Sequence, residues 1–161
     1  MQKEEYKSKL GIAGHVELIL RGPDGNIKDK RLVKDIRRTP NTITTFGDRL
    51  VADQMSDSGD TGISHMAVGT GTGGGASNNS LVTENDRNAI TSNTQGSGAA
   101  DNDIVVVGDW AAGDATAAIT EAGIFNAASG VGMFCYASFS AINKGASDTL
   151  QINWTITFGA S

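Results

Sequence analysis

The sequence predicts a mainly β protein, an antiparallel β-sandwich or barrel-like fold with one short α-helix. Within the predicted strand of residues 148–159, residues 150–158 alternate strictly between large apolar and neutral polar side chains, a period typical of a strand with one face in a core. Glycine occurs 21 times and proline twice, which favours many tight turns. Turn signals recur about every 10 to 15 residues through the last third of the chain, the spacing of an antiparallel sandwich or meander.

The length of 161 residues indicates one domain with a sizeable core. Residues 1–14 are charged and then punctuated by glycine, without a sustained period, so we expect an extended N-terminal arm. Residues 15–161 are expected to form a single β-rich domain. The sequence shows no secretory leader pattern and no run of about 18 apolar residues, so we expect neither export by a signal nor a membrane span.

The first element of the domain is predicted to be a β-hairpin. Residues 15–21 alternate between apolar and polar side chains. Asp24 and Gly25 then form the dipeptide that supplies the positive φ of a hairpin turn. The return strand, about residues 27–36, is heavily charged, and we expect it to be a solvated edge strand because charges discourage unwanted pairing at an edge.

The hairpin is followed by a predicted helix over about residues 42–55. Asn41 or Thr42 is the expected N-cap, since both side chains can accept a hydrogen bond from the first turn. The helical spacing is carried by the apolar residues Ile43, Phe46, Leu50, Val51 and Met55.

The second half of the domain predicts strands separated by glycine-rich turns. A short strand at 63–69 precedes a glycine-rich segment, an irregular element at 81–90 and a polar loop at 91–102. Further strands are expected at 104–110, 117–125, 133–140 and 148–159. The single cysteine, Cys135, lies in one of them and is interpreted as a small buried apolar residue.

Charge is distributed unevenly along the chain. The net charge is −5, but residues 1–50 hold eleven Lys or Arg against seven Asp or Glu, whereas residues 51–161 hold two against eleven. A basic front and an acidic remainder favour either pairing within the chain or contact with two different neighbours. The overall acidic balance argues against general nucleic-acid binding.

The motifs of nucleotide, metal and hydrolase sites are not supported. Gly69, Gly71 and Gly74 form a G-x-G-x-x-G pattern, but the sequence that follows does not open a helix, which a phosphate site requires. His15 and His65 lie on separate predicted strands without metal-ligand spacing. No P-loop and no serine-nucleophile elbow is present. We therefore expect no cofactor and no metal.

Two acidic residues are candidates for acid–base chemistry, Glu84 and Glu121. Glu121 lies among apolar residues, where a carboxylate needs a partner. Its favoured interpretation is a structural polar pair with Arg87. Catalysis would require a second group of suitable pKa, and the sequence indicates none. We expect that the protein is not an enzyme.

Several segments together resemble small virion structural proteins of tailed bacteriophages. The resemblance covers about residues 14–159 and is carried by 16–21 (VELILR), 24–27 (DGNI), Asn41 before a short helix, 63–72 (ISHMAVGTGT), 81–87 (LVTENDR), 119–126 (ITEAGIFN), 141–144 (AINK) and 148–158 (DTLQINWTITF). It implies a non-enzymatic β protein that decorates and stabilises the capsid as a cement protein. A tail, collar or tail-fibre component is the alternative, although the repeats or heptads typical of fibres are not visible.

The resemblance also implies partners and a location. The expected partners are the major capsid protein and further copies of the chain, with three-fold clustering common in this class. No membrane, nucleic acid or small-molecule substrate is expected. The expected location is the capsid surface of the virion, after assembly in the host cytoplasm. The candidate partner contacts are the cations Lys7, Lys9, Lys28, Lys30, Arg31, Lys34, Arg37 and Arg38.

Overall fold

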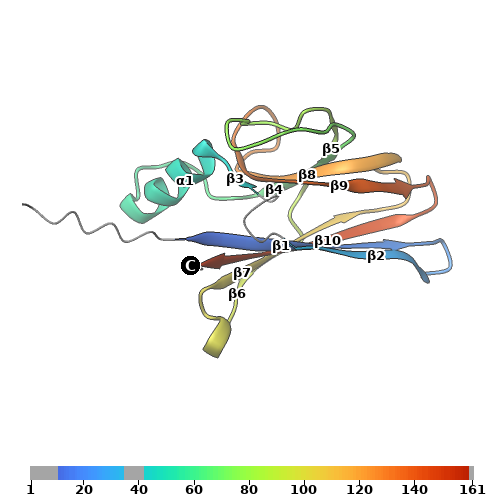
Figure 1. Cartoon of the computed structure of the whole chain (residues 1–161), viewed down its shortest axis with the longest axis horizontal. Coiled ribbons are helices and arrows are strands. Elements are labelled where there is room, and N and C mark those ends of the chain that lie inside the picture. Colours follow the sequence, from blue (N-terminus) through green and yellow to red (C-terminus); the bar gives the residue numbers. More distant parts are fainter. Residues whose placement is uncertain (1–10, 35–41, 160–161) are drawn as a thin grey trace, which may run out of the picture.

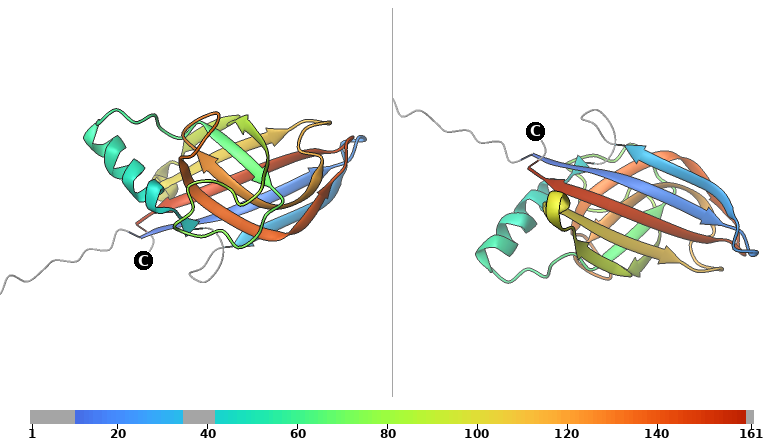
Figure 2. Two further views of the ribbon diagram at one scale, coloured as in Figure 1. Left: turned by 90° about the horizontal axis from the view of Figure 1, so that it is seen from above. Right: turned by 90° about the horizontal axis from the view of Figure 1, so that it is seen from below.

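The computed structural model describes residues 11–34 and 42–159 and confirms the predicted fold class. Two five-stranded antiparallel sheets pack face to face, with one α-helix among the described residues. Figure 1 shows the two layers and the helix α1 at one end of them. The turns of the long hairpins lie at the opposite end (Figure 2).

The first sheet is built around the C-terminal strand, and we name it the β10 sheet. Its strand order is β2-β1-β10-β7-β6, and every pairing is antiparallel. The strands are β1 (Ile12–Arg21), β2 (Ile27–Lys34), β6 (Ser92–Gln95), β7 (Asp103–Trp110) and β10 (Thr149–Phe158).

The second sheet has the order β3-β9-β8-β4-β5, and we name it the β8 sheet. Its strands are β3 (Thr42–Ile43), β4 (His65–Gly69), β5 (Glu84–Ala89), β8 (Ala117–Phe125) and β9 (Met133–Lys144). A short 3-10 helix, η1 (Gly98–Ala100), lies between β6 and β7.

The alternating pattern of β10 faces the core as predicted. Leu150, Ile152, Trp154 and Ile156 are buried between the sheets, whereas the intervening polar residues are half-buried on the other face. Trp154 has the largest side chain of the four and lies between Val16 of β1 and Val106 of β7 in the strand register. Burying a large aromatic side chain stabilises a domain by several kcal/mol, of the order of 3.

The central part of the β8 sheet, formed by β4, most of β8 and the first half of β9, is buried on both faces. Its outer face is covered by the segment 70–83, beneath which a second cluster packs, formed by Ala67, Leu81, Phe125, Met133 and Tyr136. Strands covered on both sides read as nearly continuous apolar runs. This explains why β4, β8 and the first half of β9 show little alternation in the sequence.

The helix α1 (Thr45–Ser56) begins later than the sequence predicts. Its N-cap is Thr44, whose hydroxyl accepts a hydrogen bond from the Gly47 amide at 2.9 Å, so the prediction of Asn41 or Thr42 is wrong. Thr42 instead belongs to β3, which pairs with β9. Leu50 is buried, but Met55 is 82% exposed, so the predicted apolar side packs only in part.

Two further boundaries differ from the prediction. Strand β1 begins at Ile12, inside the expected arm of residues 1–14, because residues 12–14 pair with the end of β10. The predicted polar loop at 91–102 contains the edge strand β6 and η1. Polar residues form a strand there because β7 offers a free edge for pairing.

Candidate functional site

The cations of β2 that the structure describes all contact carboxylates of the same chain. Lys28 Nζ lies 2.8 Å from the Asp148 carboxylate, and Lys30 Nζ lies 2.8 Å from that of Glu17. Pairing between the basic front and the acidic remainder, one of the two arrangements that the charge pattern favoured, therefore applies to Lys28, whereas Lys30 pairs within residues 1–50. The other predicted contacts, Lys7, Lys9, Arg37, Arg38 and the side chain of Lys34, lie outside the described residues.

Arg31, on the edge strand β2, connects the β10 sheet to the β8 sheet. Its Nε donates to both Asp29 oxygens at 3.0 and 3.1 Å, and its Nη1 donates to the main-chain carbonyl of Ser140 on β9 at 2.7 Å. A hydrogen-bonded charge on the inner side of an edge strand fixes that edge and discourages pairing with another chain. Arg31 is thus a structural tie as well as a candidate contact.

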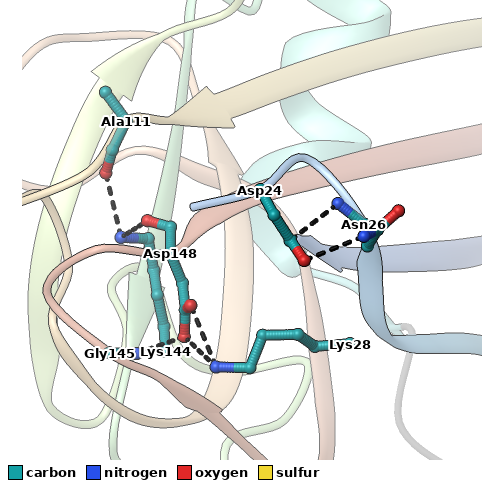
Figure 3. Close-up of polar contacts among 7 residues, drawn as sticks. All are labelled: Asp24, Asn26, Lys28, Ala111, Lys144, Gly145 and Asp148. Atoms are coloured by element: carbon teal, nitrogen blue, oxygen red, sulfur yellow. Dashed lines mark hydrogen bonds and ion pairs between the residues drawn. The ribbon is translucent and has the colours of Figure 1, made fainter. Parts of the chain in front are cut away.

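A second set of polar contacts joins three turns at the hairpin end of the sandwich. The Asp148 carboxylate accepts bonds from Lys28 and from the Gly145 amide at 2.9 Å. Lys144, which is 2% exposed, does not bond to this carboxylate. Its Nζ donates to the main-chain carbonyls of Ala111 and Asp148 at 2.9 and 2.8 Å (Figure 3). The β1–β2, β7–β8 and β9–β10 turns are therefore held together by one lysine–aspartate pair and one buried lysine.

The ionisation of these groups follows from their surroundings. The hydrogen bond from Lys28 holds the pKa of Asp148 below its usual value, and the Gly145 amide adds to the effect. Burial lowers the pKa of Lys144. In the neighbouring turn, bonds from the Asn26 side chain and amide lower the pKa of Asp24 (Figure 3). The carboxylates at this end of the molecule are stabilised in their charged form.

Glu121 performs a similar task on the β8 sheet. Its buried carboxylate accepts three main-chain hydrogen bonds, from Gly71 at 2.9 Å, Val82 at 3.1 Å and Thr83 at 2.7 Å. These bonds hold both ends of the covering segment 70–83 on the outer face of the sheet. The expectation that Glu121 has a structural partner is met by these amides.

The predicted partner was wrong, because Arg87 bonds elsewhere. Arg87 donates to Glu84 at 2.6 and 3.0 Å and to the carbonyls of Ala127 and Gly130, each at 3.1 Å. Its guanidinium lies 3.7 Å from the centre of the Phe125 ring. Arg87 is on β5 and Glu121 on β8, with β4 between them and two residues of register apart, so the pair does not form.

The glycine pattern serves the protein's own side chains. A Cβ at Gly71 would lie 2.5 Å from Glu121 Oε1, and a Cβ at Gly74 would lie 2.5 Å from Tyr136 Cζ. The Gly74 amide donates to the Tyr136 hydroxyl at 3.2 Å, and burial raises the pKa of that phenol. Close approach of the main chain to Glu121 and Tyr136 therefore accounts for glycine at these positions.

Both candidates for acid–base chemistry are engaged in structural contacts. Glu84 is bonded to Arg87, and Glu121 accepts main-chain hydrogen bonds and lies beside the Tyr136 phenol. Within residues 11–34 and 42–159, no three His, Cys, Asp or Glu side chains gather as a metal site would need. Burial raises the pKa of the Cys135 thiol well above its usual value, which opposes reactivity.

Sequence reasoning missed Lys144 and Asp148. A signal for Lys144 was present, because it has the inward parity of Ile142 along β9, and both are buried. The partners of Lys144 are main-chain carbonyls of other turns, which no local pattern marks.

Comparison of the chain with protein-family models, with curated proteins and with solved structures found no match. The helices that the structure describes are too short or too polar to serve as membrane spans. The candidate site is thus defined by its geometry alone. It consists of turns and covering segments that the buried groups Glu121 and Lys144 hold in fixed positions.

Proposed function

We propose that this chain is a structural protein of a tailed-bacteriophage particle that decorates the capsid. It binds across neighbouring major capsid protein subunits and stabilises the shell. The observation that carries the proposal is the use of the buried ionisable groups Glu121 and Lys144. Both hold turns and covering segments in place through main-chain hydrogen bonds. The resemblance of residues 14–159 to phage particle proteins supports the same class.

Fixed loops suit a protein whose work is binding. A loop that is ordered before binding avoids the entropy cost of ordering at the interface, about 0.5–1.5 kcal/mol for each immobilised side chain. A protein that binds only the assembled shell adds its binding free energy to shell stability by mass action. Glycine-rich segments held by Glu121 and Tyr136 meet this requirement.

The β2 cations are the proposed contact with an acidic capsid surface. Lys28 and Lys30 keep about half of their side-chain surface exposed, 50% and 53%, while they contact their own carboxylates. Their charge is therefore partly balanced within the chain, and we expect them to guide association more than to determine affinity. The arm and its lysines, together with Arg37 and Arg38, remain predicted contacts, and so does a homo-oligomer with three-fold clustering.

Addition of purified protein to capsids that lack it tests the proposal. Bound copies are counted after sedimentation, and gold-labelled protein is located by electron microscopy. We expect label over the head and a higher temperature of genome release. Label at the tail, collar or fibres would establish the alternative, and absence of binding would refute both.

A matched pair of variants tests the contact surface. Lys30→Glu reverses a charge on the β2 edge, and Arg49→Glu makes the same change at an exposed position of α1. We expect Lys30→Glu to slow capsid association and Arg49→Glu to leave the rate nearly unchanged. Equal effects would show that β2 is not the contact.

An activity on host polysaccharide that is lost in Glu84→Gln would place the protein among enzymes instead.

A further inference from the structure

An apolar groove of about 310 Å³ lies at the end of the sandwich beside α1. Its apolar walls include Leu50, Val51 and Met55 of α1, Ile63 of the following turn, Ile104 of β7 and Phe158 of β10. Met55 is the most exposed of the large apolar residues described, at 82%. Apolar grooves with polar surroundings are typical interaction sites, so the groove requires an occupant to be identified.

The surroundings of the groove are acidic. Residues 45–62, which form α1 and the turn after it, contain four aspartates and one arginine. Asp60 lies 3.4 Å from Arg49, and Asp53 accepts a bond from the Asp60 amide, so α1 and its turn keep a net negative charge beside the groove. An apolar groove with carboxylates around it fits an occupant that carries apolar and basic side chains together.

Residues 6–10 of the chain have this chemistry. Their sequence is Tyr-Lys-Ser-Lys-Leu, with no acidic residue. An extended segment projects alternate side chains to opposite sides, so a bound form would direct Tyr6 and Leu10 to the groove and Lys7 and Lys9 to the aspartates. We propose that the groove binds residues 6–10 of a second copy of this chain.

The strand order favours a second copy over the same chain. Gly11 accepts a bond from the Gly159 amide at 2.7 Å, which fixes the start of β1 on one side of β10. The groove residues Ile104 and Asn93 belong to β7 and β6, on the other side of β10. To enter its own groove, a chain leaving β1 would have to turn across the end of β10, whereas the groove of a second copy can receive a segment that continues in the direction of β1.

The length of the segment permits an intermolecular contact. Ten extended residues span about 33 Å, which is enough to reach a neighbouring molecule of this size. The contact is heterologous, because the segment of one copy meets the groove of the next. Such contacts close into rings where the rotation allows and otherwise continue as chains. The inference does not depend on capsid binding.

Sedimentation velocity of the full chain over a range of concentrations tests the contact. Met55→Lys changes the groove at an exposed position, and Tyr6→Ser with Leu10→Ser changes the segment. We expect wild-type protein to self-associate and each variant to associate at least about tenfold more weakly. Leu32→Lys is the control, since Leu32 is also exposed, at 49%, but lies on β2. It should leave association unchanged.

Mixing the two variants gives the decisive result. The groove variant keeps an intact segment, and the segment variant keeps an intact groove, so the mixture should form a one-to-one dimer and nothing larger. A wild-type protein that is monomeric at all concentrations, or a mixture that forms no dimer, would overturn the inference. Because no capsid is present, these outcomes are separate from those that test the proposed function.

Discussion

The two sheets of the sandwich differ in what lies on their outer faces. On the β10 sheet, polar side chains face solvent and bond to each other across strands, as Asn153 does with Glu17 at 3.0 Å and Gln151 with Asp109 at 2.9 Å. On the β8 sheet, the segment 70–83 covers the strands and encloses Glu121 and Tyr136. Glu17 on the β10 sheet and Glu121 on the β8 sheet therefore have different environments, one open to solvent and one covered.

The difference shows where this protein depends on single polar groups. Glu17 is partly exposed and contacts Lys30 and Asn153, whose hydrogen bonds lower its pKa, yet water can replace either partner. Glu121 is fully buried, and the three amides that donate to it lose their acceptor when it is removed, among them the buried Gly71 amide. Exposed ion pairs contribute little to stability, whereas buried unsatisfied donors are costly.

The largest expected effect is that of Glu121→Gln. The amide group has one acceptor oxygen in place of two, and its NH₂ would face a main-chain donor. We expect the free energy of unfolding to fall by about 3 kcal/mol, from weaker bonds and at least one unsatisfied amide. Urea denaturation measures this loss, and hydrogen exchange at Gly71 and Thr83 should accelerate.

Glu17→Gln is the matched control on the other sheet. It removes the same charge from a carboxylate that water reaches, and we expect a loss below about 1 kcal/mol. Equal losses for the two variants would contradict the distinction between the covered and the open face.

A smaller effect is expected from Gly74→Ala. The added Cβ would lie 2.5 to 2.9 Å from three carbons of the Tyr136 ring, so the covering segment must shift. Forced displacement in a packed region costs about 1–3 kcal/mol. Gly75→Ala is the control next to it, because a Cβ there meets nothing within 4 Å, and we expect a change within about 0.5 kcal/mol. Thermal unfolding of both variants measures the difference; similar melting temperatures would show that the segment is loosely held.

The same contrast explains how much of the fold could be predicted from the sequence. The outer face of the β10 sheet is open, so β10 alternates between apolar and polar residues and is evident as a strand. The helix and the hairpin turn at Asp24 and Gly25 also follow from local patterns. The N-cap was misplaced because Thr44 is selected by its contact with β9, which carries the carbonyls of Met133 and Phe134.

The candidate site was less predictable, because its contacts join distant segments. Glu121 was recognised as a buried carboxylate, but its amides are 38 to 50 residues away and are brought to it by the fold of the covering segment. Arg87, one of the two cations in residues 51–161, was the predicted partner of Glu121, and the strand register places it elsewhere. Lys28 and Asp148, 120 residues apart, meet only because β1 lies between β2 and β10.

The smallest expected effect concerns Asp148 and acid. The pKa of its carboxyl is lowered from the usual 3.8, first by the bond from Lys28 and then by the Gly145 amide. A depressed pKa in the folded state stabilises the fold above the unfolded pKa, and this contribution is lost as pH falls through the folded value. In Asp148→Asn, the side-chain oxygen still accepts the Gly145 bond, but the charge is absent.

Melting temperatures of wild type and Asp148→Asn between pH 7 and pH 2 should therefore differ most near neutral pH and converge below about pH 3.8. Other carboxylates with lowered pKa, such as Glu17 and Asp24, titrate in both proteins and do not affect the difference. Added salt should reduce it as well, because Lys28 is half exposed and its charge is screened. A difference in melting temperature that is constant with pH would mean that Asp148 stabilises the three turns by its shape and not by its charge. The hairpin end would then resemble the covered face of the β8 sheet more than the open face of the β10 sheet.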